Sequence, residues 1–574
     1  MIVTSSGKLI AGNRVIINDT VNEFLGSVSN LWSNAANWSL GVVPTANHIA
    51  VIKANCLVNS SGNVRFLVLT EGCITNVNAQ LSIATGMTNF GIINVASTLA
   101  LAGNPANYSY GVINVSGTIG LYFTVDYLLP NINFNSGCSI APTNSAGQSG
   151  RMIIDRNLSG VSISNNLVGI TINDNVRCVF NTFYVYDPYG KSFILGSNAK
   201  LTANFFSVIS GNISNTPPTE IEVRENVQFS VWQPNYQSGI FRLTTNNKNF
   251  TVNGNANQYF YVKTILIENI VVSLISSNSV YLSVLDIYGL NSGSRWDNNG
   301  SLALNGLNSF SNCIFNAYFI NSIVAYNAAN QNIRVPDDSG YLELRLQNSG
   351  VKKLTGNTTC KHLYFSGTAT LDLNGHTLTG YTKYTNAGNV ARTIPQGSYA
   401  TIEFADENLN ATQTFSSGTT VEEVLFRTYS FNQSSVVMNG VVPTLWRFIR
   451  QFTQQINNVN FTFLNLRLEM QSGSPGGLSL SNSNVIIIGT LDFRRNGGVI
   501  YNGASSLICS TLIFSADSQN IFGNLTFTNL EIKGTGTKTL TTNIVVNGSY
   551  YRNPATILNK NGFTIKDSLG DDLE

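Results

Sequence analysis

A repeat of 20 residues is the feature that most constrains how this chain can fold. Residues 91–101 (GIINVASTLAL) are matched by residues 111–121 (GVINVSGTIGL). Twenty residues is the size of one coil of a β-solenoid, and stacked coils place equivalent side chains above one another. The repeat therefore predicts two apolar columns, one with Ile92 over Val112 and one with Leu99 over Ile119.

Longer repeats lie in the C-terminal half of the chain. Each pair of segments shares its apolar residues and its Asn, Gly and Thr at the same spacing. The matched segments are 344–357 with 530–543, 374–378 with 561–565, 461–468 with 525–532, and 484–490 with 543–549. The chain is thus repetitive in both halves.

The local pattern is that of short β-strands. Leu525 and Phe527 alternate with Thr526 and Thr528, and such runs end at Asn-Gly, Ser-Gly or Gly-Thr turn pairs. We predict an all-β fold, an elongated right-handed β-helix or β-solenoid with little helix; β-sandwich elements and antiparallel hairpins fit the pattern in places. The stretch 443–455 has apolar residues at helical spacing, and they also alternate as in a strand.

Composition narrows the function. Of 574 residues, 43% are hydrophobic and 10% aromatic, which argues against disorder, while only 11% are charged and the net charge is +2. Since Lys and Arg form no cluster, nucleic acid is not an expected partner. No apolar run is long enough for membrane insertion.

The seven cysteines are scattered and lack CxxC spacing, so we interpret them as core residues. No metal or other cofactor is expected.

Two stretches resemble a known family. Trp32 to Ser39 followed by Gly41-Val42-Val43-Pro44, and residues 530–547 with Asn-Gly-x-Thr-Leu at 374–378, resemble the repetitive β-solenoid surface proteins of Bacteroidota. The resemblance covers about a quarter of the chain and implies a fold and a habitat rather than an activity.

The ends of the chain depart from that family. The start, Met1 to Lys8, lacks a secretory signal pattern, and the acidic end, 566–574, is not a sorting domain. The departure favours a virion protein of a bacteriophage of such hosts: a tail fibre, tail spike or head fibre, for which the resemblance implies a homotrimer. A precursor that begins upstream of Met1 is the alternative.

Four regions are expected along the chain. Residues 1–30 are an N-terminal attachment segment, 31–335 a β-solenoid body, 336–460 a second repeat region and 461–574 a C-terminal repeat region. The main boundary is placed at the turn Pro336 to Gly340.

No residue is assigned a catalytic role from the sequence. The three histidines, His48, His362 and His376, form no recognisable Ser/His/Asp motif, and His376 is expected at a half-exposed packing position. Paired carboxylates would suit polysaccharide cleavage. Each pair has a plainer interpretation as a charged strand face, a turn or two opposite faces: Glu220 with Glu222, Asp337 with Asp338, and Glu422 with Glu423.

Tyrosines give the more suggestive pattern. Tyr184 and Tyr186 share one strand face, as do Tyr259 and Tyr261, and rows of exposed rings can stack on sugars. We predict these four as glycan contacts, with a subunit interface as the more frequent role of such residues. Lone tryptophans at 232, 296 and 446 are expected in the core, whereas Trp32 and Trp38 are expected to cap the solenoid end.

The sequence thus predicts a non-enzymatic structural protein of a phage virion that attaches to the host surface. Its expected partners are its own copies, other virion proteins and a host glycan or protein, and its expected location is the virion. The alternatives are a secreted bacterial adhesin on the cell surface and a tail-spike depolymerase.

Overall fold

The structure is a computed structural model of the whole chain. It describes residues 2–3, 9–11, 14–16, 20–102, 108–124, 126–129, 132–143, 150–164, 168–186, 193–209, 213–215, 220–230, 235–244, 248–254, 258–268, 270–277, 280–307, 310–405, 411–427, 430–432, 436–450, 454–457, 460–470, 478–494, 497–502, 505–522 and 526–574.

Nearly every described element is a β-strand, and the strands stack in parallel as a β-solenoid, which confirms the predicted fold class. Across the described ranges the helical content is a single 3-10 turn, η1 (Ala35–Asn37), and there is no helix that is long and apolar enough to cross a membrane. The helical alternative for 443–455 was wrong. Its described residues form β49 (Leu445–Arg450) and the start of β50 (Gln454–Asn457), because Trp446 and Phe448 alternate into the core.

The chain divides into two compact units, Met1–Asn316 and Ala317–Glu574. The boundary expected at Pro336 lies inside the second unit. Within the expected attachment segment, β1 (Ile2–Val3), β2 (Leu9–Ala11) and β3 (Arg14–Ile16) form an antiparallel sheet, whereas β4 (Thr20–Phe24) pairs in parallel with the first coil. The other sequence-based limits stay predictions.

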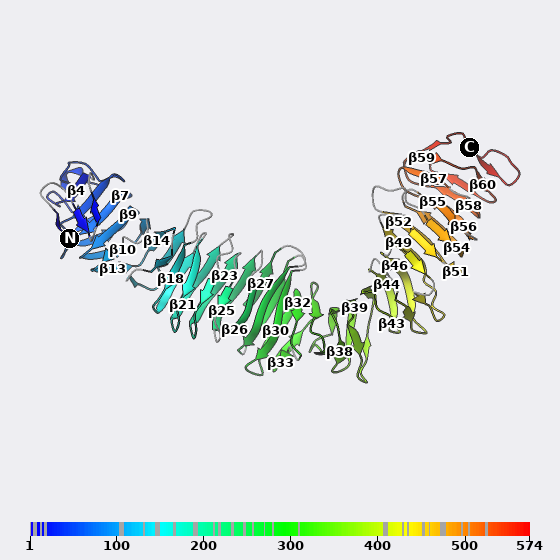
Figure 1. The fold of residues 1–574 in the computed structure, drawn as a ribbon, viewed down its shortest axis with the longest axis horizontal. Helices are drawn as coiled ribbons and strands as arrows, with labels where there is room; N and C mark the ends of the chain where they lie inside the picture. Colours follow the sequence, from blue (N-terminus) through cyan, green and yellow to red (C-terminus); the bar gives the residue numbers. More distant parts are fainter. Residues whose placement is uncertain are drawn as a thin grey trace. The chain divides into compact units, whose positions relative to one another are not determined.

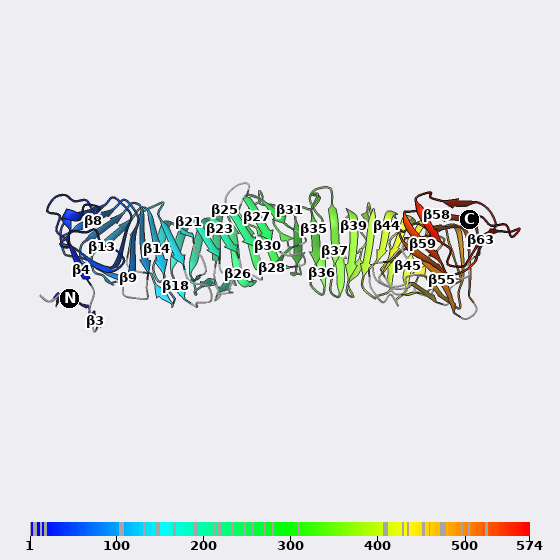
Figure 2. The same cartoon turned by 90° about the horizontal axis from the view of Figure 1, so that it is seen from above.

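In the first unit many coils give a short strand to one of two five-stranded sheets and a longer strand to a broad sheet (Figures 1 and 2). The first short sheet has the order β16 (Asn133–Phe134), β13 (Val112–Val115), β10 (Ile92–Val95), β8 (Ile74–Val77), β6 (Cys56–Val58), and the second runs from β15 (Tyr127–Leu128) to β24 (Ile213–Asn215). The broad sheet includes β5 (His48–Ile52), β7 (Gly62–Leu69), β9 (Leu81–Asn89), β11 (Thr98–Ala102), β14 (Thr118–Tyr122), β17 (Ser139–Thr143), β19 (Leu158–Ser164), β21 (Arg177–Tyr186) and β23 (Lys200–Ile209).

The 20-residue repeat stacks in the predicted register. Ile92 pairs with Val112 and Leu99 with Ile119. The second column is fully buried, as expected for core residues. The first column is not part of the core: it points outward, with Ile92 37% and Val112 42% exposed.

Beside that outward column runs a ladder of asparagine side chains, one per coil. The Nδ2 of Asn94 donates to Oδ1 of Asn76 at 2.9 Å, and Asn114 donates to Asn94 at 2.9 Å. Asn133 continues the ladder to Asn114 at 3.3 Å. Since each amide both donates and accepts, the ladder ties four successive coils together along the solenoid axis.

Residues 25–47, the cap segment, cover the first coil. Leu57 of edge strand β6 exchanges backbone hydrogen bonds with Asn30 and Trp32, and Trp38 bridges Phe24 of edge strand β4. The Trp32 and Trp38 rings lie 4.7 Å apart and are both buried. The predicted capping role of the two tryptophans is therefore confirmed.

One asparagine holds the cap segment in shape. The Oδ1 of buried Asn37 accepts from the amides of Val28 and Ser29, and its Nδ2 donates to Ser29 Oγ and to the Leu31 carbonyl. All four bonds lie within the segment, so this one side chain fixes the path of the loop.

The second unit repeats the scheme with one broad sheet and several short ones. Its broad sheet includes β37 (Tyr341–Leu346), β39 (Thr358–Ser366), β42 (Lys383–Ala387), β44 (Ser398–Phe404), β46 (Thr420–Phe426), β49, β52 (Leu466–Met470), β54 (Asn484–Phe493), β56 (Ser506–Phe514) and β58 (Thr526–Ile532). Among the short strands are β36 (Gln331–Ile333), β38 (Val351–Leu354), β57 (Gln519–Phe522) and β59 (Gly536–Leu540).

The core of both units is apolar and aromatic. Trp296 and Trp446 are buried as predicted, and Trp232 lies outside the described residues. All seven cysteines are free and buried, as expected for core residues. Burial raises the pKa of Cys56 and of Cys178 to about 12, which keeps both thiols neutral and unreactive at neutral pH.

Candidate functional site

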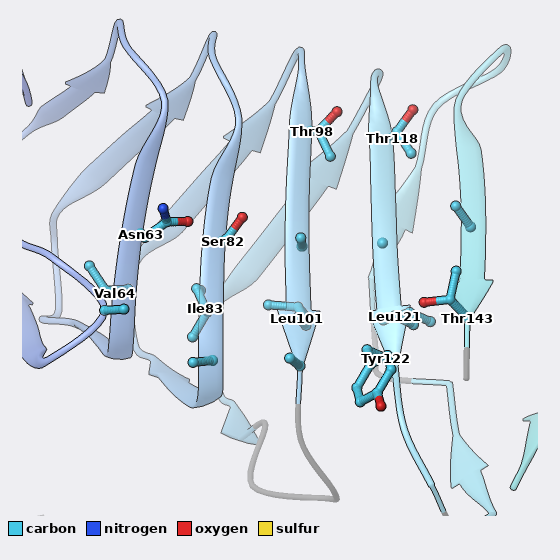
Figure 3. A pocket seen from close by; sticks show the side chains of 16 residues that line it. Asn63, Val64, Ser82, Ile83, Thr98, Leu101, Thr118, Leu121, Tyr122 and Thr143 are labelled. Carbon is cyan, nitrogen blue, oxygen red and sulfur yellow. The ribbon is translucent and has the colours of Figure 1, made fainter. Parts of the chain in front are cut away.

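The broad sheet of the first unit carries a shallow trough of roughly 470 Å³ on its outer face. Figure 3 shows it running across successive strands from β7 to β17. None of the residues that line it is charged. They are Ala46, Asn63, Val64, Ser82, Ile83, Ala84, Thr98, Ala100, Leu101, Ala102, Thr118, Gly120, Leu121, Tyr122, Ala141 and Thr143.

The floor of the trough is one column of small outward residues. The strand register places Asn63 beside Ser82, Ser82 beside Ala100, Ala100 beside Gly120, and Gly120 beside Ala141. Because neighbouring strands lie ~4.8 Å apart, the column repeats a small side chain at every coil. The hollow therefore arises from side-chain size and not from a break in the sheet.

The two long rims differ in chemistry. Thr98 and Thr118 stand in register along one rim and offer hydroxyl groups, as Figure 3 shows. Tyr122, 39% exposed, stands on the other rim beside Thr143. Ala46, from the cap segment, lies at the N-terminal end. The trough thus combines an apolar floor, hydroxyl donors and one aromatic ring.

Tyr184 continues the floor column, and Tyr186 shares its face. Ile140 pairs with Ile163, so Ala141 stands beside the exposed residue Ser164, which in turn pairs with Tyr184. Both tyrosines are half-buried. The run of small side chains therefore ends at the Tyr184 ring, six strand spacings or roughly 29 Å from Asn63.

Tyr259 and Tyr261 belong to another strand of the coil. They lie on β28 (Tyr259–Ile267), which pairs with β30 (Tyr281–Gly289), whereas the column of Tyr184 continues through β23 to other strands. Their rings stack at 6.1 Å, and Tyr259 also stacks at 4.9 Å on buried Tyr281. The structure therefore brings one predicted tyrosine pair to the trough face and not the other. A glycan contact stays a prediction for all four.

Most of the carboxylates considered from the sequence are engaged in ion pairs or turns. Glu220 accepts from Arg242 at 2.8 Å and Glu222 from Arg224 at 3.0 Å. Asp337 pairs with Arg334 at 3.0 Å, and Asp338 accepts the amides of Ala317 and Tyr318. Glu423 lies 3.4 Å from Arg447, and Glu422 is exposed.

One side-chain relay was not expected from the sequence. His362 Nδ1 lies 3.0 Å from Glu343 Oε2, and its Nε2 lies 2.9 Å from Thr385 Oγ1. Burial alone would raise the pKa of the Glu343 carboxyl, but hydrogen bonding to His362 and the charge of Arg345 outweigh burial and lower the pKa. A carboxylate, an imidazole and a hydroxyl group in this order are also the side chains of a hydrolase catalytic triad.

The hydroxyl of that relay is poorly placed to attack a substrate. Thr385 is only 3% exposed, so the relay satisfies polar groups beneath the surface. The other histidines lie apart: His48 accepts from the Thr45 amide, and His376 is half-buried, as predicted.

The trough is therefore the described feature best suited to binding. Its polar groups are neutral, and its rim ring can stack on an apolar ligand face. Among the described residues, no three His, Cys, Asp or Glu side chains gather as a metal site would require. Comparison of the chain with protein-family models, with curated proteins and with solved structures finds no match.

Proposed function

We propose that this chain is an adhesive fibre protein, not an enzyme, and that it binds a neutral surface glycan along the trough of its first unit. The observation that carries the proposal is the uncharged column from Asn63 to Ala141, which ends at the Tyr184 ring. A sugar ring has an apolar C–H face and a rim of hydroxyl groups. Such a ligand matches small floor residues, threonine hydroxyls and tyrosine rings.

The architecture supports an adhesive role. Parallel coils with satisfied backbone ladders and a covered first coil give a stiff body without any need for a cofactor. We further propose, from the sequence resemblance, that the fibre belongs to a bacteriophage virion and acts as a homotrimer on the host surface. A cell-surface adhesin of a bacterium would use the same trough, and gene neighbourhood separates the two settings.

Filling the trough tests the proposal directly. A Cβ added at Gly120 would meet Ala100 at 3.6 Å, an ordinary contact, so the backbone accepts a side chain here and Gly120→Phe is expected to fill the floor. We expect G120F to abolish binding to an array of neutral oligosaccharides. Y184A should weaken it about five- to tenfold, as loss of one aromatic contact predicts. Thr251→Phe, further along the Tyr184 column, is the matched control and should bind normally.

Two results would overturn the proposal. One is full binding by G120F, and the other is wild-type binding that is confined to charged glycans. Chain length of the bound glycan is measured in the same samples. Shortening of the glycan over time would move the assignment to the depolymerase alternative.

A further inference from the structure

The outer face of the second unit's broad sheet carries charged side chains that are grouped in ion-paired clusters. On β42 to β54, three clusters alternate along the solenoid axis. Glu403 lies between Lys383 at 3.5 Å and Arg427 at 2.6 Å. Asp492 lies between Arg467 at 3.2 Å and Arg494 at 2.8 Å.

The middle cluster has the opposite composition. Arg447 lies 3.4 Å from Glu423 and 2.6 Å from Glu469, and its neighbours raise its pKa against the effect of burial. Counting formal charges, the Glu403 and Asp492 clusters each carry one net positive charge, and the Arg447 cluster carries one net negative charge.

The two positive clusters are layered. The side chains of Glu403 and Asp492 are only 10% and 8% exposed, so the carboxylates lie beneath the surface. Three of the four cations above them are well exposed, with Lys383 at 43%, Arg427 at 44% and Arg494 at 45%, while Arg467 is 31% exposed. In the middle cluster, Arg447 at 29% and Glu469 at 27% are equally exposed. A ligand that approaches this face therefore meets cations at two places.

The spacing of the two places follows from the strand order. Glu403 on β44 and Asp492 on β54 are separated by β46, β49 and β52, which pair in sequence. Four strand spacings correspond to about 19 Å. The negative middle cluster lies halfway and disfavours an anionic group there.

We propose that this face is a second binding surface, for a polysaccharide that carries carboxylate groups at wide intervals. One carboxylate sits over Lys383 and Arg427 and another over Arg467 and Arg494. The Arg447 cluster between them selects against densely charged polymers. The proposal is independent of the trough, because it uses another unit and the opposite ligand chemistry.

Carboxymethyl dextran is the probe, because its charge density is set by substitution on a neutral chain. We expect the full chain to bind sparsely substituted carboxymethyl dextran more tightly than dense or unsubstituted dextran. Binding should weaken as salt rises from 50 to 300 mM, since exposed charges are screened. Surface plasmon resonance on immobilised polymer measures these affinities.

Removing cations and removing a carboxylate are expected to change the affinity in opposite directions. The double variant K383Q/R427Q should bind about fivefold or more weakly, and R467Q/R494Q should do the same. Glu403→Gln leaves both cations without their shared carboxylate and should tighten binding. Lys53→Gln with Arg224→Gln, two cations of the first unit that are 46% exposed, form the control and should change nothing.

Circular dichroism establishes that each variant is folded, and the two double variants keep the test available if E403Q is not. Equal affinities for the wild type and both double variants would overturn the proposal. So would affinity that climbs steadily with charge density. Loss of neutral glycan binding in G120F bears only on the trough.

Discussion

Two lysines of the second unit are buried although the chain has few charges to place. Lys352 on β38 and Lys538 on β59 occupy matching positions in the repeat and are 0% exposed. Each stands next to a buried glutamine of the preceding coil, Gln331 or Gln519. The Nζ of Lys352 donates to the Ala328 carbonyl, so the buried ammonium closes a coil corner.

The Lys352 charge makes stability depend on pH. Burial lowers the pKa of Lys352 from 10.5 to about 8. Between these values the unfolded chain holds a proton that the folded chain has lost, so folding becomes more favourable as pH rises. Lys352→Met removes this pH dependence. We expect the free energy of unfolding of K352M, relative to that of the wild type, to fall by about 3 kcal/mol from pH 7 to pH 10.5.

Urea unfolding of both proteins across that pH range measures the difference. Lys353→Met, whose side chain is on the exposed face of the same strand, is the control. Parallel pH profiles for K352M and the wild type would show that the ammonium is not desolvated in the folded state.

At the scale of the element, the unit of the fold is one coil. Residues 91–102 and 108–110 are the described part of one coil, and the coils on both sides of it offer the same partners: Asn76 and Asn114 for the asparagine ladder, and β9 and β14 for the broad sheet. A solenoid of this kind is a sum of coils and of the interfaces between them.

Removal of one whole coil should therefore leave a folded protein. In the deletion of residues 91–110, Phe90 directly precedes Gly111, and we expect equivalent side chains of the two flanking coils to stack in register. We expect a native β-sheet circular dichroism spectrum and cooperative urea unfolding with a slightly smaller m-value, in proportion to the surface lost. Deletion of residues 91–100, half a coil, shifts the register and should not fold. Equal behaviour of the two deletions would contradict the coil as the unit.

The coil as the repeating unit of the fold also explains which contacts the sequence could and could not predict. Leu99 over Ile119 follows from the repeat, because a fixed spacing in a parallel stack means adjacency. The relay of Glu343, His362 and Thr385 does not follow, since the separations are 19 and 23 residues and coil length varies. The trough was missed because Ala100 and Gly120 carry no chemical signal until their outward direction is known.

At the scale of the whole molecule, association between copies stays a prediction. The second unit exposes apolar side chains on strands β54 and β56, with Ile486 at 47%, Ile488 at 61% and Ile508 at 52%. Ile486 and Ile508 are partners in register, so these side chains form a contiguous strip. Exposed apolar strips are a common feature of surfaces that other chains cover.

Light scattering of the full chain tests the homotrimer. We expect a native mass three times that of the 62.2 kDa chain, unchanged on tenfold dilution. Replacement of Ile486 and Ile508 by Thr should lower that mass if the strip lies in the contact, whereas Thr251→Phe should not. A wild-type protein of 62.2 kDa would exclude the homotrimer in solution.

The cap segment has a consequence for how molecules meet each other. Without residues 25–47, strands β4 and β6 would present rows of unpaired amides and carbonyls at the first coil. A strand of another molecule could pair with these groups and expose its own unpaired amides and carbonyls to a further strand, which is how an amyloid fibril grows at its tip. We therefore expect the segment that Trp32, Trp38 and Asn37 hold in place to block templated polymerisation at this end of the chain.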